Sequence, residues 1–298
     1  MILLTVIYSD EKYDITEKLN KMQSYFSKHE VLLGFSESIN MNHHFIEIYS
    51  LNPNLTCSAK KNICRYIASY IFQLYVENFC KGDFFGIIED TYFFLKGEEI
   101  KKVEINFKKI LTKDKEVYKD EVLGCINIKN DAIEKIVQCM MEKNEINIEG
   151  YYTFRKRDLK TDMEEILNKI VEQFMIQKEY DEFIKLLKYF VNIQESKIEL
   201  IEIIINDKGD YSIRNANGES IIEEMIQDIN GSNYEGNVGI EDLIISGLIT
   251  YCPEKINIYG KENCKNNEMV ETIKNVFEDK VYFCDTREIE KVKSPLHV

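Results

Sequence analysis

Residues 197–218, KIELIEIIINDKGDYSIRNANG, decide the fold of the carboxyl-terminal part of this chain. The run of isoleucines in residues 198–206 has the β-branched composition of a buried strand. Asp207-Lys208-Gly209-Asp210 then forms a cluster of turn-favouring residues, and residues 211–214 supply a returning strand that ends at Asn215-Ala216-Asn217-Gly218. The stretch therefore predicts a β-hairpin.

The residues after this hairpin alternate between helical and strand patterns. We expect, in chain order, a helix at 221–229, a Gly/Asn/Ser loop at 231–239, a buried helix at 240–252, a strand at 255–259, a helix at 267–277 and a strand at 280–284. A strand, helix and strand in succession favour a right-handed parallel crossover. Residues 197–285 are therefore predicted to form a compact α/β unit with a small mixed sheet.

The amino-terminal part begins with a β-α-β-β pattern. It consists of a strand at 2–8, a helix with Ile15, Leu19, Met22 and Phe26 on one side, and strands at 31–38 and 44–49. A core helix is expected at 58–79. Residues 83–95 fit either a second helix or a strand, and the alternation of Val103, Ile105 and Phe107 predicts a short edge strand.

A helical hairpin is predicted in the middle of the chain, at about residues 161–192. Thr161 and Glu164 resemble a capping box at the start of its first helix, and a second apolar helix is expected around residues 180–191. The overall class is α+β or α/β. We expect an amino-terminal α/β region at 1–120, followed by a region at 121–298 that contains the hairpin and the carboxyl-terminal unit.

Composition restricts the classes of partner. The chain has 298 residues, a formal net charge of −14 and 44% apolar residues, which is typical of a globular protein whose field repels nucleic acid and anionic lipid. The apolar start is too short for a signal peptide, and no apolar run reaches membrane-spanning length. The eight cysteines contain no Cys-x-x-Cys pair. We therefore expect a cytoplasmic protein with reduced thiols and no membrane span.

No catalytic residue, cofactor or metal site is predicted. His43-His44 is the one histidine cluster, and neighbouring strand residues point to opposite faces, which prevents them from sharing a metal ion. The loop at 260–267 follows a strand and precedes a helix, as in nucleotide-binding folds. It lacks both the three-glycine fingerprint and the Gly-Lys-Ser/Thr of a P-loop, and Glu268 and Glu271 follow it.

The candidate binding residues lie in the stretch 151–157, where aromatic and basic side chains adjoin in an acidic protein. They are Tyr152, Phe154, Arg155, Lys156 and Arg157. One interpretation is a strand or loop that docks Phe154 in the core and pairs its arginines with neighbouring acids. The alternatives are a contact with a protein partner, an anionic ligand, or single-stranded nucleic acid held by stacking and charge.

Four strings in the second half resemble a known family. They are residues 154–157, FRKR; 179–191, EYDEFIKLLKYFV, followed by Gln194; 241–249, EDLIISGLI, followed by Cys252-Pro253; and 271–277, ETIKNVF. In order and spacing they are similar to the YtxC-like family of endospore-forming bacteria, which is linked to sporulation by name. The resemblance spans about residues 151–285 and implies no particular activity, cofactor or catalytic residue.

The function expected from these observations is a non-enzymatic role in sporulation through contacts with a protein partner that the sequence does not identify. Nucleic acid is disfavoured as a partner, and the oligomeric state is open. Two alternatives stay open: an enzyme with a site between the two halves that uses Arg155 or Arg157 with carboxylates, and a protein that binds single-stranded nucleic acid through residues 151–157.

Overall fold

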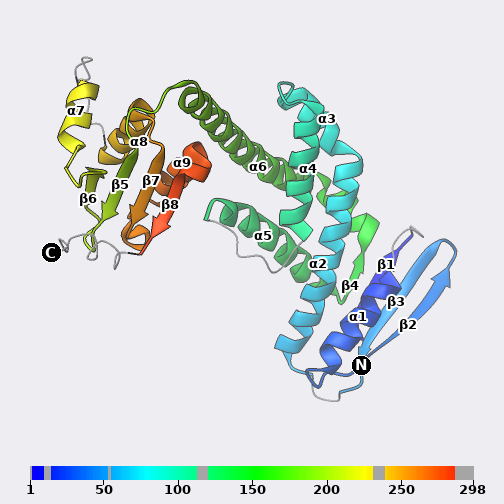
Figure 1. The fold of residues 1–298 in the computed structure, drawn as a ribbon. Helices are drawn as coiled ribbons and strands as arrows, with labels where there is room; N and C mark the ends of the chain where they lie inside the picture. The colour runs from blue at the N-terminus through cyan, green and yellow to red at the C-terminus, as the bar shows by residue number, and fades with distance from the viewer. Residues whose placement is uncertain (1, 10–14, 53–54, 113–119, 231–238, 286–298) are drawn as a thin grey trace. The chain divides into compact units, whose positions relative to one another are not determined.

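The computed structural model describes residues 2–9, 15–52, 55–112, 120–230 and 239–285. The chain divides into two compact units, Met1–Met175 and Ile176–Val298, and each is described by itself. Figure 1 shows helices and two small sheets, which confirms the α+β class expected from the sequence.

The sheet of the first unit contains β1 (Ile2–Tyr8), β2 (Leu33–Asn40), β3 (His43–Ser50) and β4 (Glu145–Asn147) in the order β2-β3-β1-β4. β3 pairs antiparallel with both β1 and β2, and α1 (Ile15–Ser27) lies along the sheet (Figure 1). The predicted β-α-β-β opening is confirmed. The sequence analysis missed β4, which pairs parallel with β1 over three residues and comes from far along the chain.

Helices fill the rest of the first unit: α2 (Cys57–Lys81), α3 (Asp83–Thr91), α4 (Gly97–Thr112), α5 (Asp120–Lys143) and the first part of α6 (Ile148–Ile193). The edge strand predicted from Val103, Ile105 and Phe107 is wrong. Those residues lie in α4, where Val103 and Phe107 are buried one turn apart and Ile105 is exposed. Val103 and Phe107, four residues apart, fit both the strand and the helix period, whereas the next buried residue, Leu111, continues the helical one.

The predicted helical hairpin at 161–192 is also wrong, because α6 is one helix of 46 residues. No glycine or proline occurs between Gly150 and Gly209, so the sequence supplies no residue that would break the helix. Thr161 is not an N-cap. Its hydroxyl donates to the carbonyl of Arg157, 3.0 Å away, which is the bond that an interior threonine makes to the preceding turn.

The sheet of the second unit has the order β6-β5-β7-β8 and is mixed, as predicted. The hairpin of β5 (Leu200–Ile205) and β6 (Tyr211–Asn215) is antiparallel, whereas β5, β7 (Lys255–Tyr259) and β8 (Val281–Cys284) run parallel. The helices are α7 (Ile222–Asn230), α8 (Ile240–Tyr251) and α9 (Asn267–Phe277), with short 3-10 turns η1 (Lys261–Asn263) and η2 (Glu278–Lys280). Most of the predicted loop at 231–239 lies outside the described residues.

One face of this sheet is apolar and packs in the core of the unit. The isoleucines at 201, 203, 213, 256 and 258 are all at most 1% exposed. Helices α8 and α9 lie side by side against the sheet (Figure 1), and Asn266 caps α9 by accepting the backbone N–H of Glu268 at 3.0 Å. Burial of alternate isoleucines in a row explains why the local pattern predicted these strands correctly.

A hydrogen bond from a cysteine thiol connects the end of α8 to the end of α6. Cys252 caps α8 in the left-handed conformation, with a φ of 45°, immediately before Pro253. Its Sγ donates to the carbonyl of Val191, 3.2 Å away, in the last turn of α6. This contact supplies a partner to one of the carbonyls that every helix leaves unbonded at its carboxyl end.

A proline at position 177 tests whether α6 is continuous. Gln177→Pro removes one helical hydrogen bond and places its ring against the preceding turn, so we expect a loss of about 3 kcal/mol in the free energy of unfolding. Thermal and urea unfolding followed by circular dichroism measure this loss, with Gln177→Ala as the matched control. If both variants proved equally stable, a turn rather than a helix would occupy this position.

Replacing each of two glycines by alanine is expected to change the stability of the protein in opposite directions. Gly260 has a φ of +68°, and a Cβ there would lie 2.3 Å from the carbonyl oxygen of Ile205, so Gly260→Ala should destabilise the fold by at least about 1 kcal/mol. Gly86 lies in α3 with no atom near its would-be Cβ, so Gly86→Ala should stabilise by roughly 0.5–1 kcal/mol. Denaturant midpoints of the two variants decide the signs.

Candidate functional site: the groove between α5 and α6

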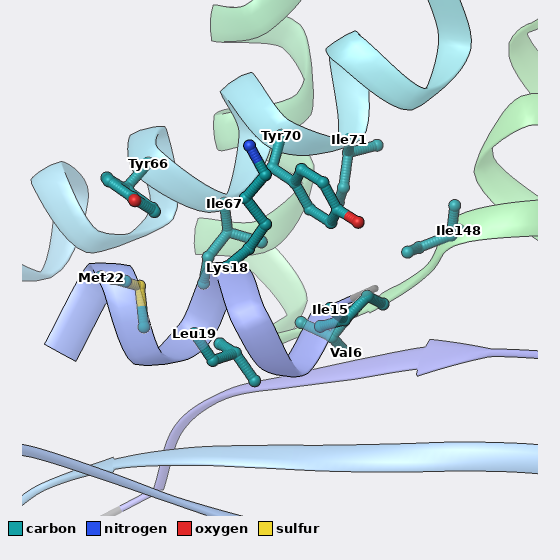
Figure 2. A pocket seen from close by; sticks show the side chains of 10 residues that line it. All are labelled: Val6, Ile15, Lys18, Leu19, Met22, Tyr66, Ile67, Tyr70, Ile71 and Ile148. Carbon is teal, nitrogen blue, oxygen red and sulfur yellow. The ribbon is translucent and has the colours of Figure 1, made fainter. Parts of the chain in front are cut away.

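An apolar crevice between α1 and α2 lies in the first unit, where Figure 2 shows the ten side chains around it. Aliphatic residues such as Leu19 and Ile67 line most of it, and the Lys18 ammonium lies 5.2 Å from the centre of the Tyr70 ring. The cavity has a volume of about 10 Å³, which is scarcely room for one water molecule. It is a small packing gap in the hydrophobic core and is too small for a ligand.

The loop at 260–267 adjoins a polar cleft in the second unit that is lined by charges of both signs, such as Lys261, Glu271 and Lys274. At the same end of the sheet, Glu241 of α8 accepts from the Tyr211 hydroxyl and from the Asn266 side chain, each at 3.0 Å. Its carboxylate is therefore occupied by protein donors, and its charge at the start of a helix opposes an incoming anion. This arrangement stabilises the loop and does not resemble a phosphate site.

The two adjacent histidines stand at the start of β3. His44 Nδ1 lies 2.8 Å from Glu37 Oε1, and its ring stacks on Tyr8 with the centroids 4.7 Å apart. Burial, and then the neighbouring Glu37 carboxylate, raise the pKa of Tyr8 to about 12. Within the described residues, no three histidine, cysteine or carboxylate side chains converge in the way that a metal ion requires.

A hollow lies between α5 and α6 in the first unit, and we call it the α5–α6 groove. It has a volume of about 260 Å³, and its lining residues are Lys135, Gln138, Cys139, Glu142 and Lys143 of α5 and Tyr151, Phe154 and Arg155 of α6. The residues of each helix are three or four positions apart, so that they share one face. The chain turns between the two helices at Asn144, which has a φ of 53°.

Phe154 and Arg155 dominate the exposed side of the groove. Phe154 is 84% exposed, so the expectation that it docks in the core is wrong. The Arg155 guanidinium lies 5.5 Å from the centre of the Phe154 ring and 3.2 Å from Asp158 Oδ2. On α5, Lys135 pairs with Asp162 of α6 at 3.4 Å. The groove therefore combines an aromatic ring with cations that are only partly neutralised at the surface.

The other predicted residues do not join them. Tyr152 packs toward the core, where its hydroxyl donates to the carbonyl of Ile71 and its ring contacts Tyr75. Lys156 and Arg157 are exposed. The stretch is helical, so Arg157 lies about 200° around the helix from Arg155 and cannot share its groove.

Tyr151 lies in the stretch 151–157 that the sequence singled out, whereas sequence reasoning missed the whole α5 side of the groove. The three-or-four spacing of Lys135, Gln138, Cys139 and Glu142 was an available signal, but no helix was assigned to that region. Burial raises the pKa of Tyr151 to about 12, against the opposing effect of Arg155. The phenol is therefore neutral at physiological pH and can donate a hydrogen bond.

The sequence profile of the YtxC-like family matches residues 65–282. This chain belongs to the YtxC-like family. It is similar to "Uncharacterized protein YtxC" of Bacillus subtilis (strain 168), with 20% identity over 221 residues that cover 74% of this chain and 76% of that protein. No solved structure matches the chain.

The family match confirms the resemblance seen in the sequence and extends it toward the amino terminus. It begins at Arg65 in α2 and includes every residue that lines the α5–α6 groove. The groove is thus part of the region that the family shares. Among the described residues, no helix combines the length and the apolar character needed to cross a membrane.

The raised pKa of Tyr151 predicts how stability depends on pH. The unfolded tyrosine ionises near pH 10, whereas the folded one holds its proton to about pH 12, so the contribution of Tyr151 to stability is complete below pH 10 and is lost as the pH rises toward 12. Tyr151→Phe should therefore show a smaller loss of stability over this interval. Urea unfolding at several alkaline pH values tests this, and equal slopes in both proteins would contradict it.

Proposed function

We propose that this protein acts in sporulation, without catalysis of its own, by holding an acidic segment of a partner protein in the α5–α6 groove. The exposed ring of Phe154 beside Arg155 is the observation that carries this proposal. The link between the YtxC-like family and sporulation supports the cellular setting. The cations and the exposed aromatic ring of the groove support an acidic protein segment as the partner.

Local charge favours an acidic segment. The chain has a net charge of −14, yet the lining of the groove includes three cations, Lys135, Lys143 and Arg155, and one carboxylate, Glu142. At physiological ionic strength charges are screened beyond about 8 Å, so the distant acids matter little. A bound carboxylate would compete with Asp158 for Arg155 and with Asp162 for Lys135, both of which are surface ion pairs. Carboxylates of the partner can form charge-assisted hydrogen bonds with Arg155 and the lysines.

Phe154 supplies the apolar part of the contact. Covering most of an exposed phenylalanine removes on the order of 150 Å² from water, which is worth about 3 kcal/mol. An aromatic anchor surrounded by polar groups is the usual composition of a binding hot spot. Phe154 is therefore expected to contribute more to affinity than any single cation of the groove.

The two alternative functions have less support from this geometry. An enzyme site that uses Arg155 or Arg157 with carboxylates would need one of these arginines in a pocket with acidic residues. Arg155 lines the open groove and pairs with Asp158, and Arg157 is exposed on another side of α6. A nucleic-acid strand carries a phosphate at every nucleotide, so it would place more negative charge than a short acidic segment against Glu142, Asp158 and Asp162, which adjoin the groove cations. A short peptide that combines an apolar side chain with a few carboxylates fits the groove better.

The test is affinity capture from sporulating cells with the full-length protein as bait. Phe154→Glu should lose the partner that the unaltered protein captures, because it replaces the apolar anchor with a carboxylate among the partner's acids. The matched control is Ile105→Glu. It also replaces an exposed apolar side chain by a carboxylate, but at a position on α4 outside the groove, where the isoleucine is 64% exposed. It should retain the partner.

Two results would count against the proposal. One is a set of captured proteins that is the same for Phe154→Glu and for the unaltered chain. The other is tight, salt-sensitive binding of a labelled oligothymidine that Phe154→Glu abolishes, which would favour single-stranded nucleic acid instead. Circular dichroism of each variant confirms that the fold is retained.

A further inference from the structure

The part of α6 that belongs to the second unit carries an exposed row of large apolar residues. We call this row the α6 stripe; it consists of Phe183, Leu186, Phe190 and Ile193, which are 51%, 53%, 41% and 59% exposed. Their spacing of three, four and three residues is that of the a and d positions of a coiled coil. Tyr189, 61% exposed, flanks the stripe with its ring against that of Phe190.

The α6 stripe is separate from the face by which this helix packs in its own unit. Ile184, Leu187 and Val191 are buried in the core of the second unit, and Lys188 forms an ion pair with Glu278. The stripe lies roughly 100° further around the helix. A helix at the surface of a domain needs only one apolar face to pack in its core. This part of α6 has a second apolar face, and an exposed apolar patch of this kind is typical of a surface that another protein covers.

We propose that the α6 stripe pairs with the α6 stripe of a second copy of this chain, with the two helices antiparallel. A two-fold axis that crosses the stripe at the level of residue 188 places Leu186 of one copy against Phe190 of the other, and Phe183 against Ile193, because both pairs are centred on that position along the helix. A surface that is complementary to itself about such an axis gives a closed dimer. This inference does not depend on the function proposed for the α5–α6 groove.

Charge decides between the antiparallel and the parallel arrangement. Glu179 occupies the d position one heptad before Leu186. In a parallel pair the two Glu179 carboxylates would meet in the seam, which is unfavourable. In the antiparallel pair Glu179 lies beyond Ile193 of the other copy, the last residue of α6, and its carboxylate stays in water.

The area available agrees with a reversible dimer. Each of the five half-exposed side chains, including Tyr189, presents roughly 100 Å² to solvent, so that pairing would bury on the order of 1,000 Å² in total. Specific interfaces begin at about this size. The dimer should therefore form at high protein concentration and dissociate on dilution.

Sedimentation of the full chain across a wide concentration range tests the dimer. The unaltered protein should associate reversibly, and Leu186→Glu or Ile193→Glu should weaken association by at least about tenfold by placing a charge in the seam. The control is Ile105→Glu, which alters a 64% exposed apolar residue of α4 outside both the stripe and the groove and should leave association unchanged. A chain that is monomeric throughout, or Glu variants that associate normally, would overturn the proposal.

Disulfide cross-linking tests the direction of the helices. Under mild oxidation, a mixture of Leu186→Cys and Phe190→Cys chains should form mixed dimers, whereas Leu186→Cys alone should cross-link slowly. The unaltered chain measures the background from its own eight cysteines. Faster cross-linking of Leu186→Cys with itself would indicate a parallel pair and would overturn the antiparallel arrangement.

Discussion

The continuity of α6 is the constraint on which the rest of the structure depends. Its first part supplies Met163, Ile166 and Ile170 to the core of one unit, and its last part supplies Ile184 and Leu187 to the core of the other. A single uninterrupted series of backbone hydrogen bonds thus serves two cores that share no buried cluster in the described residues. Because the helix is regular, a side chain's position along it decides whether that side chain becomes core, groove or stripe.

The two surfaces of interest are what remains of α6 after both cores are filled. Phe154 lies on the side of α6 opposite to Tyr152, which the first core takes up, and Leu186 lies next to Leu187, which the second core takes up. Leaving large apolar side chains in water contributes nothing to folding, and a charged residue would be at least as helical at these positions. These are the two surfaces that we propose to bind other chains.

The sequence predicted elements whose information is local and failed where the information is distant. The isoleucines of β5 and the turn after them, or the stripe of α1, each lie within one short segment, and those elements were assigned correctly. β4 has three residues and becomes a strand only because β1 lies beside it. The hairpin was assigned from two apolar runs although no residue between them can end a helix. Similarly, composition identified Phe154 and Arg155, whereas Lys135 and Cys139 join them only through the packing of α5 on α6.

The thiol of Cys252 also ties together distant parts of the chain. It closes a loop of 61 residues when it reaches the carbonyl of Val191, and it does so from a left-handed backbone that only the completed end of α8 imposes. Closing a loop of this length costs conformational entropy, which the burial of Val191 and Cys252 in one core offsets. The last turn of α6 is thereby anchored by a residue that comes after β5, β6, α7 and α8 in the chain.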